Sequence, residues 1–248
     1  MLNKDFAVCI QAADFSETSQ VLTFFSKQNG KIRCLAKGSK RPKSSYDGAI
    51  ELFAYGDIVF SSSGEDKLST LTEFEQQKSF TALAGNFAAL NSALFAAELL
   101  SKFTKENDPH PQLFDCFLQF LQDSNESPQT GSLWLSLLIL FQLSLLKEIG
   151  LQPVLNQCIN CKRKYEPQAT GSRFYFSSSA NGLVCSDCES AFTDKVRLSP
   201  AASKCLTNLK LIAQADENTL KEIEKILIYH FTEMLGKPPK MAKYILKT

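Results

Sequence analysis

The stretch KIRCLAKGSKRPKS, residues 31–44, carries the pattern that decides how the N-terminal part of the chain folds. In residues 31–37, three of the four odd positions are Lys or Arg, and the even positions are Ile, Cys and Ala. Successive side chains of a strand point to opposite faces of a sheet. The stretch therefore predicts a strand with a cationic outer face and an inner face whose small, apolar side chains suit a barrel interior.

Segments on both sides of this stretch share a short, partly alternating pattern rich in Val, Ile, Thr and Phe, which predicts strands. The five predicted strands are residues 6–12, 19–26, 31–37, 53–62 and 67–74. Two dipeptides between pairs of them, Asn29-Gly30 and Ser63-Gly64, predict hairpin turns. Five short strands in so short a segment fit a small closed barrel, and the OB-fold is the five-stranded one. Residues 38–52 would form its main exposed loop.

After residue 80 the apolar residues recur at helical spacing. Predicted helices are residues 81–102, 112–121, 133–150, 200–213 and a segment from Asp216 to Gly236, with a polar loop at 123–131. The apolar run of residues 133–146 is too short for a membrane span and suits the centre of a helical domain. The predicted fold class is α+β: an N-terminal five-stranded OB-fold β-barrel followed by an α-helical domain with an inserted four-cysteine zinc finger. The predicted domains are 1–79 for the barrel, 80–157 and 191–248 for the two helical parts, and 158–190 for the insertion.

Four cysteines form the most specific motif of the chain. Cys158 and Cys161 are separated by two residues, as are Cys185 and Cys188, and 23 residues lie between the two pairs. Two such pairs supply four thiolates to one tetrahedral Zn²⁺, which leaves no open coordination position. We therefore predict one structural Zn²⁺ per chain. The alternatives are unmetallated thiols or a redox pair, although redox motifs of this kind occur singly.

The eight cysteines would also suit a secreted scaffold, but the N-terminal sequence MLNKDFAVCI lacks the pattern of a signal peptide. We therefore expect a cytoplasmic, nucleoid-associated protein with no membrane partner. In that compartment isolated cysteines are usually small core residues. This group comprises Cys9, Cys34, Cys116 and Cys205.

The cations of residues 31–44 form the second candidate site. Because the net charge of the chain is only +1, affinity for a polyanion must come from such a local cluster. The predicted DNA-binding residues are Lys31, Arg33, Lys37, Lys40, Arg41 and Lys43. A charge run alone is more often a solvated face or protection of a sheet edge. Three features favour binding: the cations cluster in one loop of a predicted OB-fold, aromatic residues follow them as candidate base platforms, and the compensating acidic residues come later in the chain. The aromatic residues are Tyr46, Phe53 and Tyr55, and the acidic residues are Glu65, Asp66, Glu73 and Glu75.

Several catalytic signatures are absent from the sequence. It has no phosphate-binding Gly-x4-Gly-Lys-Ser/Thr loop, no Gly-x-Gly-x2-Gly and no His-Glu-x2-His motif. No His-x-Glu precedes the cysteines, which argues against a zinc deaminase. Of the two histidines, His230 lies on the apolar face of a predicted helix, where a core role is expected. The sequence therefore argues against an enzyme.

Several strings together resemble the bacterial RecO family of recombination mediators. They are AKGSKRPKS at 36–44, DFSETS at 14–19 before LTFF at 22–25, YFS at 175–177 leading to GLVC at 182–185, and LGKPPK at 235–240. The resemblance covers nearly the whole chain, and the order and spacing of the strings carry it.

The resemblance implies an OB-fold, a zinc finger inserted in a helical domain, and no catalysis. It also implies binding of single- and double-stranded DNA and annealing of complementary strands coated by single-strand binding protein. The implied protein partners are RecR, the C-terminal tail of single-strand binding protein, and the RecA pathway. Because Ser39-Lys40 stands where the family often has Ala-Arg, the charge is kept but bidentate phosphate contact is weakened.

Two functions of other classes stay open. A nucleic-acid-processing enzyme with a structural zinc module would need clustered carboxylates in a cleft, and metal-dependent nicking of DNA would reveal it. A protein-interaction scaffold would use the basic loop to bind an acidic partner, and its affinity for DNA would be weak.

Overall fold

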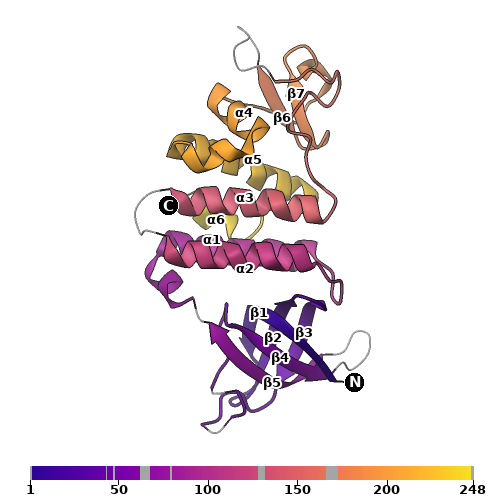
Figure 1. The fold of residues 1–248 in the computed structure, drawn as a ribbon. Helices are drawn as coiled ribbons and strands as arrows, with labels where there is room; N and C mark the ends of the chain where they lie inside the picture. Colours follow the sequence, from indigo (N-terminus) through magenta and orange to yellow (C-terminus); the bar gives the residue numbers. More distant parts are fainter. Residues whose placement is uncertain are drawn as a thin grey trace. The chain divides into compact units, whose positions relative to one another are not determined.

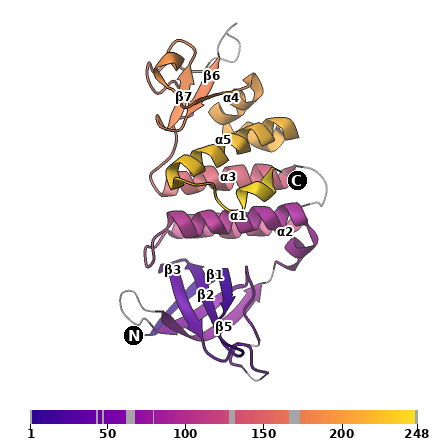
Figure 2. The same ribbon diagram turned by 180° about the vertical axis from the view of Figure 1, so that it is seen from behind.

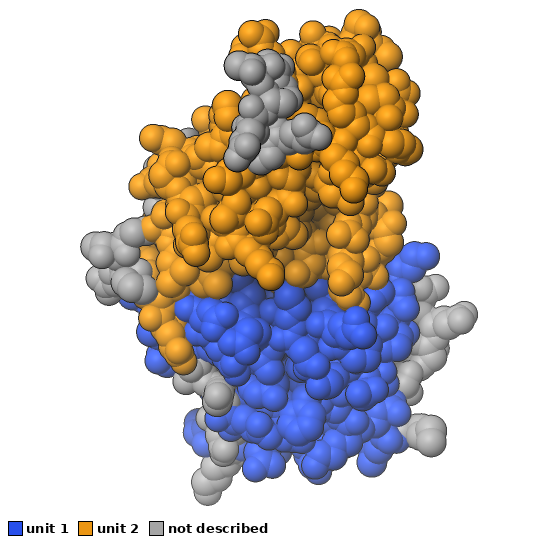
Figure 3. All heavy atoms as spheres, turned by 45° about the horizontal axis from the view of Figure 1, so that its top comes forward, with its two compact units in different colours: residues 1–85, 97–125 blue, residues 86–96, 126–248 orange. Residues whose placement is uncertain are grey.

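The computed structural model describes residues 2–42, 44–46, 48–61, 68–78, 80–127, 132–165 and 173–246 (Figure 1). The chain divides into two compact units (Figure 3). Unit 1 comprises Met1–Gly85 and Ala97–Asn125, and unit 2 comprises Asn86–Ala96 and Glu126–Thr248. The domain boundaries predicted from the sequence stay a prediction.

The strands of unit 1 form a closed barrel in the order β1-β2-β3-β5-β4 (Figures 1 and 2). They are β1 (Leu2–Asp14), β2 (Gln20–Ser26), β3 (Gly30–Ala36), β4 (Tyr55–Ser61) and β5 (Ser69–Lys78). All neighbouring pairs are antiparallel except β3 and β5, which pair in parallel. The predicted five-stranded barrel is confirmed, and each strand begins and ends within a few residues of its predicted bounds. Ser63-Gly64 lies outside the described residues.

Strand β3 shows why the alternating pattern specifies the barrel. Ile32, Cys34 and Ala36 are buried in its core, whereas Arg33 is exposed. The hairpin turn before β3 needs glycine at Gly30, which has φ +67°. Glycine is the residue that adopts this conformation without steric cost. The predicted hairpin at Asn29-Gly30 is therefore confirmed.

Helical segments complete unit 1 and begin unit 2. The 3₁₀ helix η1 (Thr81–Gly85) precedes α1 (Phe87–Phe103), and α2 (Pro111–Glu126) follows. The single predicted helix at 81–102 is wrong because Asn86 interrupts it: the Asn86 side chain accepts a hydrogen bond from the Ala89 amide, 3.2 Å away, and so caps the start of α1. The predicted loop at 123–131 is wrong up to residue 126, where α2 continues, and residues 128–131 lie outside the described part.

The apolar run found in the sequence forms one of the helices of unit 2. They are α3 (Leu133–Glu148), α4 (Pro200–Thr207), η3 (Leu209–Gln214), α5 (Glu217–Leu235) and α6 (Ala242–Ile245). Ser199 and Asp216 cap α4 and α5 with their side chains, and Gly236 ends α5 with φ +67°. The predicted helix at 200–213 is two pieces, because Asn208 has non-helical backbone angles between them. Among the described residues, no helix is long and apolar enough to cross a membrane.

A small sheet in unit 2 carries the cysteine pairs. Its strands are β6 (Phe174–Ser177), β7 (Gly182–Cys185) and β8 (Lys195–Arg197), in the order β7-β6-β8, with the 3₁₀ helix η2 (Glu189–Ala191) between β7 and β8. Strands β6 and β7 form an antiparallel hairpin. His230 is buried against this sheet, where its Nδ1 lies 2.7 Å from Ser178 Oγ and its ring meets the edge of Phe176. The predicted core role of His230 is confirmed.

Candidate functional site

The loop after β3 is fixed to the barrel by a buried serine. Ser39 is fully buried, and its hydroxyl donates to Gln20 Oε1 over 2.9 Å. Gln20 also bonds both backbone groups of Ile50: its Oε1 accepts from the amide at 3.0 Å, and its Nε2 donates to the carbonyl at 3.2 Å. One glutamine side chain thus joins β2 to two positions of the long segment between β3 and β4.

Two further hydrogen bonds join the same loop to the β1–β2 turn. The Lys40 amide donates to the Thr18 carbonyl at 3.1 Å, and the Gly38 amide donates to Ser19 Oγ at 3.1 Å. A loop with this many backbone and buried side-chain bonds has lost most of its conformational freedom before any ligand binds. Binding of a partner would therefore cost little additional backbone entropy in this loop.

Gly38 determines how Arg41 lies. Gly38 has φ +70°, and its carbonyl accepts from the Arg41 amide at 3.0 Å, which closes a tight turn. A Cβ atom at Gly38 would lie 3.4 Å from Cδ of Arg41, so the stem of the arginine passes directly over the glycine. Glycine permits the turn because it adopts this φ without steric cost. The Arg41 side chain is exposed at the surface of the loop.

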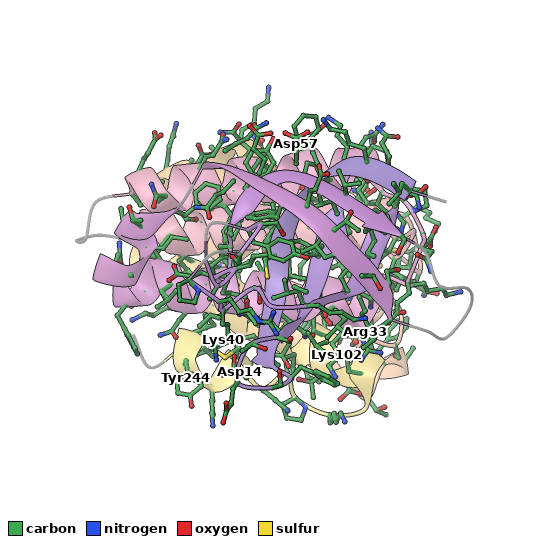
Figure 4. The ribbon with its side chains drawn as sticks, turned by 90° about the horizontal axis from the view of Figure 1, so that it is seen from below. Asp14, Arg33, Lys40, Asp57, Lys102 and Tyr244 are labelled. Carbon is green, nitrogen blue, oxygen red and sulfur yellow. The ribbon has the colours of Figure 1, made fainter. Side chains whose placement is uncertain are left out.

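The predicted DNA-binding cations differ in how open they are. Lys37 and Arg41 are exposed, and Arg33 is exposed with its Nε 3.9 Å from Glu106 Oε1. Lys40 is paired with Asp14, its Nζ lying 2.8 Å from Oδ2, and Figure 4 shows the two side chains together. A pair of this exposure contributes little and can exchange for a phosphate. Lys43 lies outside the described residues.

Lys31 is held inside unit 1. Its half-buried ammonium donates to the carbonyls of Ser101 at 2.7 Å and Thr104 at 2.6 Å, at the C-terminal end of α1. Burial lowers the pKa of Lys31, and Lys102, in the last turn of α1, contributes to the same shift. While it keeps these two bonds, Lys31 stabilises the end of a helix. Arg33 and Lys102, both exposed and labelled in Figure 4, each contribute to the lowered pKa of Lys31.

The aromatic residues assigned as base platforms are placed differently from the prediction. Tyr46 and Phe53 are buried, and the Tyr46 hydroxyl donates to the Leu71 carbonyl at 2.6 Å. Tyr55 is half-buried between Phe6 and Phe114, with ring centroids 6.4 and 6.5 Å away. The platform hypothesis is therefore wrong for Tyr46 and Phe53, because packing in a small barrel takes up their rings.

The four cysteines of unit 2 converge. The Sγ atoms of Cys158, Cys161, Cys185 and Cys188 all lie within 4.8 Å of one another. Cys158 Sγ accepts from the Cys185 amide at 3.4 Å, and Asn160 Nδ2 donates to Cys188 Sγ at 3.3 Å. Burial opposes ionisation of Cys158, but the backbone amides of Cys161, Cys185 and Asn160 outweigh it and lower its pKa to about 6. Four sulfur ligands at this spacing, with N–H donors directed at two of them, could hold a metal ion.

A charged bridge connects the two cysteine pairs. Arg163 Nη2 lies 2.6 Å from Asp187 Oδ2, and these residues follow Cys161 and Cys185 by two positions each. The Arg163 carbonyl also accepts from the Cys158 amide at 2.7 Å. The turns that present the sulfurs are therefore joined by contacts of their own.

Sequence reasoning missed Ser39, Gln20 and Lys102. A serine between glycine and lysine in a polar loop carries no signal of burial, and the contacts of Ser39 and Gln20 join segments 19 or 30 positions apart. Lys102 carried one usable signal, since it is a cation in the last turn of a predicted helix.

Two family descriptions match the chain. Recombination protein O N terminal matches residues 1–80, and Recombination protein O C terminal matches residues 84–243. The chain belongs to the RecO family. This finding confirms the resemblance found in the sequence and includes the chain among DNA repair proteins.

The alignments with individual relatives cover this chain almost completely. The DNA repair protein RecO of Bacillus pumilus is 30% identical over 252 residues, which are 99% of this chain and 94% of the relative. That of Bacillus subtilis is 25% identical with the same coverage, and that of Listeria monocytogenes serotype 4b is 27% identical over 98% of this chain. In this RecO family protein Lys31, Arg33, Lys37, Lys40 and Arg41 belong to unit 1, and Cys158, Cys161, Cys185 and Cys188 belong to unit 2.

Proposed function

We propose that this chain is a mediator of DNA repair and homologous recombination that binds single- and double-stranded DNA and anneals complementary strands coated by single-strand binding protein. With RecR it would promote the loading of RecA, and it breaks or forms no covalent bond. The observation that carries the proposal is the prearranged cationic loop after β3, in a chain whose relatives are named DNA repair proteins. The partners RecR, single-strand binding protein and RecA come from family membership.

The proposed mechanism is electrostatic. Two complementary strands are polyanions, and their repulsion opposes the approach that pairing needs. Cations on the protein that contact phosphates lower this repulsion and carry no sequence information, so the base edges stay free to pair. A loop fixed by Ser39 and Gln20 would present those cations without losing further entropy.

The contacts divide the six predicted cations into different roles. Arg33, Lys37 and Arg41 are proposed to bind phosphates directly, and Lys40 would do so by exchanging Asp14 for a phosphate. Lys31 would act by fixing β3 to α1. Lys43 is retained as a phosphate contact from the sequence alone. Four such contacts, or five with Lys40, predict a log–log salt slope of about −3 to −3.5 for single-stranded DNA.

The metal is proposed to be one structural Zn²⁺, held by Cys158, Cys161, Cys185 and Cys188. Four thiolates fill a tetrahedral site, so a bound Zn²⁺ would join the two cysteine pairs and leave no position for substrate. Asn160 and the Arg163–Asp187 pair would orient the sulfurs. Elemental analysis of freshly purified, unchelated protein should give about one zinc atom per chain, and its absence would remove this part of the proposal.

The decisive experiment is annealing of complementary oligonucleotides precoated with single-strand binding protein. The test variant is Lys37→Glu/Lys40→Glu/Arg41→Glu. The matched control is Lys210→Glu/Lys225→Glu/Lys237→Glu, which changes the net charge equally at three exposed lysines of unit 2. Thermal unfolding confirms that both variants fold.

We expect annealing to be lost in the loop variant and retained in the control. Equal loss in both variants would mean that net charge alone matters. Full activity in both variants would mean that the loop cations form a solvated surface and do not bind DNA. Metal-dependent nicking of DNA by the wild-type chain would favour the nucleic-acid-processing enzyme. Weak DNA binding that is insensitive to strand length would favour the protein-interaction scaffold.

A further inference from the structure

Phe15 is the most exposed aromatic side chain among the described residues of unit 1, with 63% of its surface open. The other exposed aromatic side chain in that described part, Phe6, is 40% exposed and stacks on Tyr55. Phe15 lies in the turn between β1 and β2, next to Asp14. Its ring is therefore accessible to a ligand.

The turn that carries Phe15 is ordered by its own hydrogen bonds. The amides of Phe15 and Ser16 donate to the Ser19 carbonyl at 2.9 and 3.2 Å. The Thr18 amide donates to Ser16 Oγ at 3.4 Å. The exposure of the ring is thus built into a closed turn.

The same turn is joined to the cationic loop at three points. Thr18 accepts from the Lys40 amide, Ser19 accepts from the Gly38 amide, and Asp14 pairs with the Lys40 ammonium. Figure 4 shows Asp14 and Lys40 side by side. Because Phe15 directly follows Asp14, its backbone lies in the turn that these bonds join to the loop bearing Lys37, Lys40 and Arg41.

An open aromatic ring beside fixed cations matches one ligand chemistry. Each nucleotide of a single strand offers a phosphate to the cations and a flat base to the ring, and every base can stack. In duplex DNA the bases are already stacked on one another and cannot reach a side chain without being flipped out.

We propose that Phe15 stacks on an unpaired base of single-stranded DNA whose phosphates lie on Lys37, Lys40 and Arg41. The inference rests on the proposed function and deepens it: the cations bind either form of DNA, and Phe15 adds a preference for single strands. It also takes the platform role that Tyr46 and Phe53 cannot fill.

The test measures the dissociation constants of a fluorescent oligo-dT, of an oligomer of equal length without bases, and of a duplex, all at one salt concentration. The variants are Phe15→Ala and Phe15→Trp. The control is Phe87→Ala, which removes an equally exposed phenylalanine, 67% open, from unit 2.

We expect Phe15→Ala to weaken oligo-dT binding about tenfold, the scale of one lost base–aromatic stack. Binding of the abasic oligomer and of the duplex should stay within twofold, as should all three affinities of Phe87→Ala. Phe15→Trp should keep oligo-dT affinity, and its added fluorescence should be quenched by oligo-dT but not by the abasic oligomer.

The outcomes separate the two proposals. If the wild type binds none of the three ligands, the proposed function fails. If the wild type binds them and Phe15→Ala weakens oligo-dT and the abasic oligomer equally, or neither, only the stacking role of Phe15 is overturned. If Phe15→Ala leaves DNA binding intact but changes the mass measured by light scattering, the ring is a protein contact and the stacking proposal is wrong.

Discussion

At the scale of single residues, the cationic loop depends on a side chain that itself carries no charge. Ser39 is buried and bonds Gln20, which holds β2 and Ile50 together. The buried polar anchor Ser39 is followed directly by two exposed cations, Lys40 and Arg41. Ser39 therefore helps to fix the positions of the charged residues that follow it. A substitution of Ser39 that removes no charge should for this reason change DNA binding.

The substitution Ser39→Ala removes one buried hydrogen bond but leaves Gln20 Oε1 bonded to the Ile50 amide. The expected loss of unfolding free energy is therefore about 1 kcal/mol. Because the loop loses one of its anchors, affinity for single-stranded DNA should fall several-fold with the salt slope unchanged, since no cation is lost. Urea unfolding and fluorescence titration at several salt concentrations measure both effects. Unchanged affinity in the destabilised variant would contradict the role of the anchor.

Glu224 is a second informative residue. It is fully buried on α5, and its Oε1 accepts from Gln142 Nε2 at 2.8 Å. Burial raises the pKa of Glu224 to about 8, although the bond from Gln142 lowers it in part. The unfolded carboxyl titrates near a pKa of about 4.3. Between these values the folded state binds more protons than the unfolded state, so stability falls as pH rises.

The variant Glu224→Gln should remove this pH dependence. Relative to wild type, we expect little difference in unfolding free energy at pH 5 and a gain on the order of 3 kcal/mol at pH 8. Urea unfolding of both proteins at the two pH values measures it. A variant that is less stable than wild type at pH 8 would mean that the carboxylate is ionised and held by partners.

At the scale of elements, β3 and the end of α1 act together in unit 1. Lys31 donates to two carbonyls of α1, whereas Arg33, two positions along the same strand face, is open. Lys31 and Arg33 both occupy odd positions of the alternating pattern, but Lys31 stabilises the end of α1 and Arg33 is exposed to solvent. A matched pair of substitutions separates them.

Lys31→Gln should cost about 1.5–3 kcal/mol of unfolding free energy, because hydrogen bonds from a charged donor are lost, and should leave the salt slope of DNA binding unchanged. Arg33→Gln should change stability by less than about 0.5 kcal/mol, and should make the slope shallower by about 0.7. Chemical unfolding and salt titrations of both variants give the four numbers. A reversal of the two effects would assign phosphate binding to Lys31.

The same elements show how far the sequence leads. Alternation in β3 and the turn at Gly30 are local patterns, and both were predicted because the residues that cause them are neighbours. The four-cysteine cluster was predicted because the spacing of the two cysteine pairs is typical of a site that holds one metal ion. Features caused by residues that are neighbours in the sequence, or that have a characteristic spacing, can therefore be predicted from the sequence.

Features that join distant segments could not be predicted. Nothing near Lys31 in the sequence indicates that Ser101 and Thr104 will accept its hydrogen bonds, and nothing near Tyr46 indicates that Leu71 will accept its hydroxyl. The breaks at Asn86 and Asn208 were missed for a related reason, since apolar spacing continues across both residues and hides the change of helix. Tertiary contacts decide these cases.

At the scale of the whole molecule, the two candidate sites belong to different compact units. The described loop cations are in unit 1, which has its own barrel core, and the four cysteines are in unit 2. The contacts that fix the cationic loop all come from unit 1, including Gln20, Thr18 and Ser19. The metal should therefore be needed for the fold of its own segment and be dispensable for the charge arrangement of the barrel.

This separation predicts the result of removing the metal. Cys161→Ser should lose bound zinc and lower the unfolding temperature, because the ion contributes to folding of the segment it joins. Its affinity for single-stranded DNA and its salt slope should stay within about twofold of wild type, since no phosphate contact is changed. Cys116→Ser, outside the cluster, is the control and should keep the metal. Elemental analysis, thermal unfolding and DNA titration of the three proteins test the prediction. A tenfold loss of DNA affinity confined to Cys161→Ser would mean that the cysteine segment itself binds DNA. The expectation that DNA binding by unit 1 is independent of the metal site in unit 2 would then be wrong.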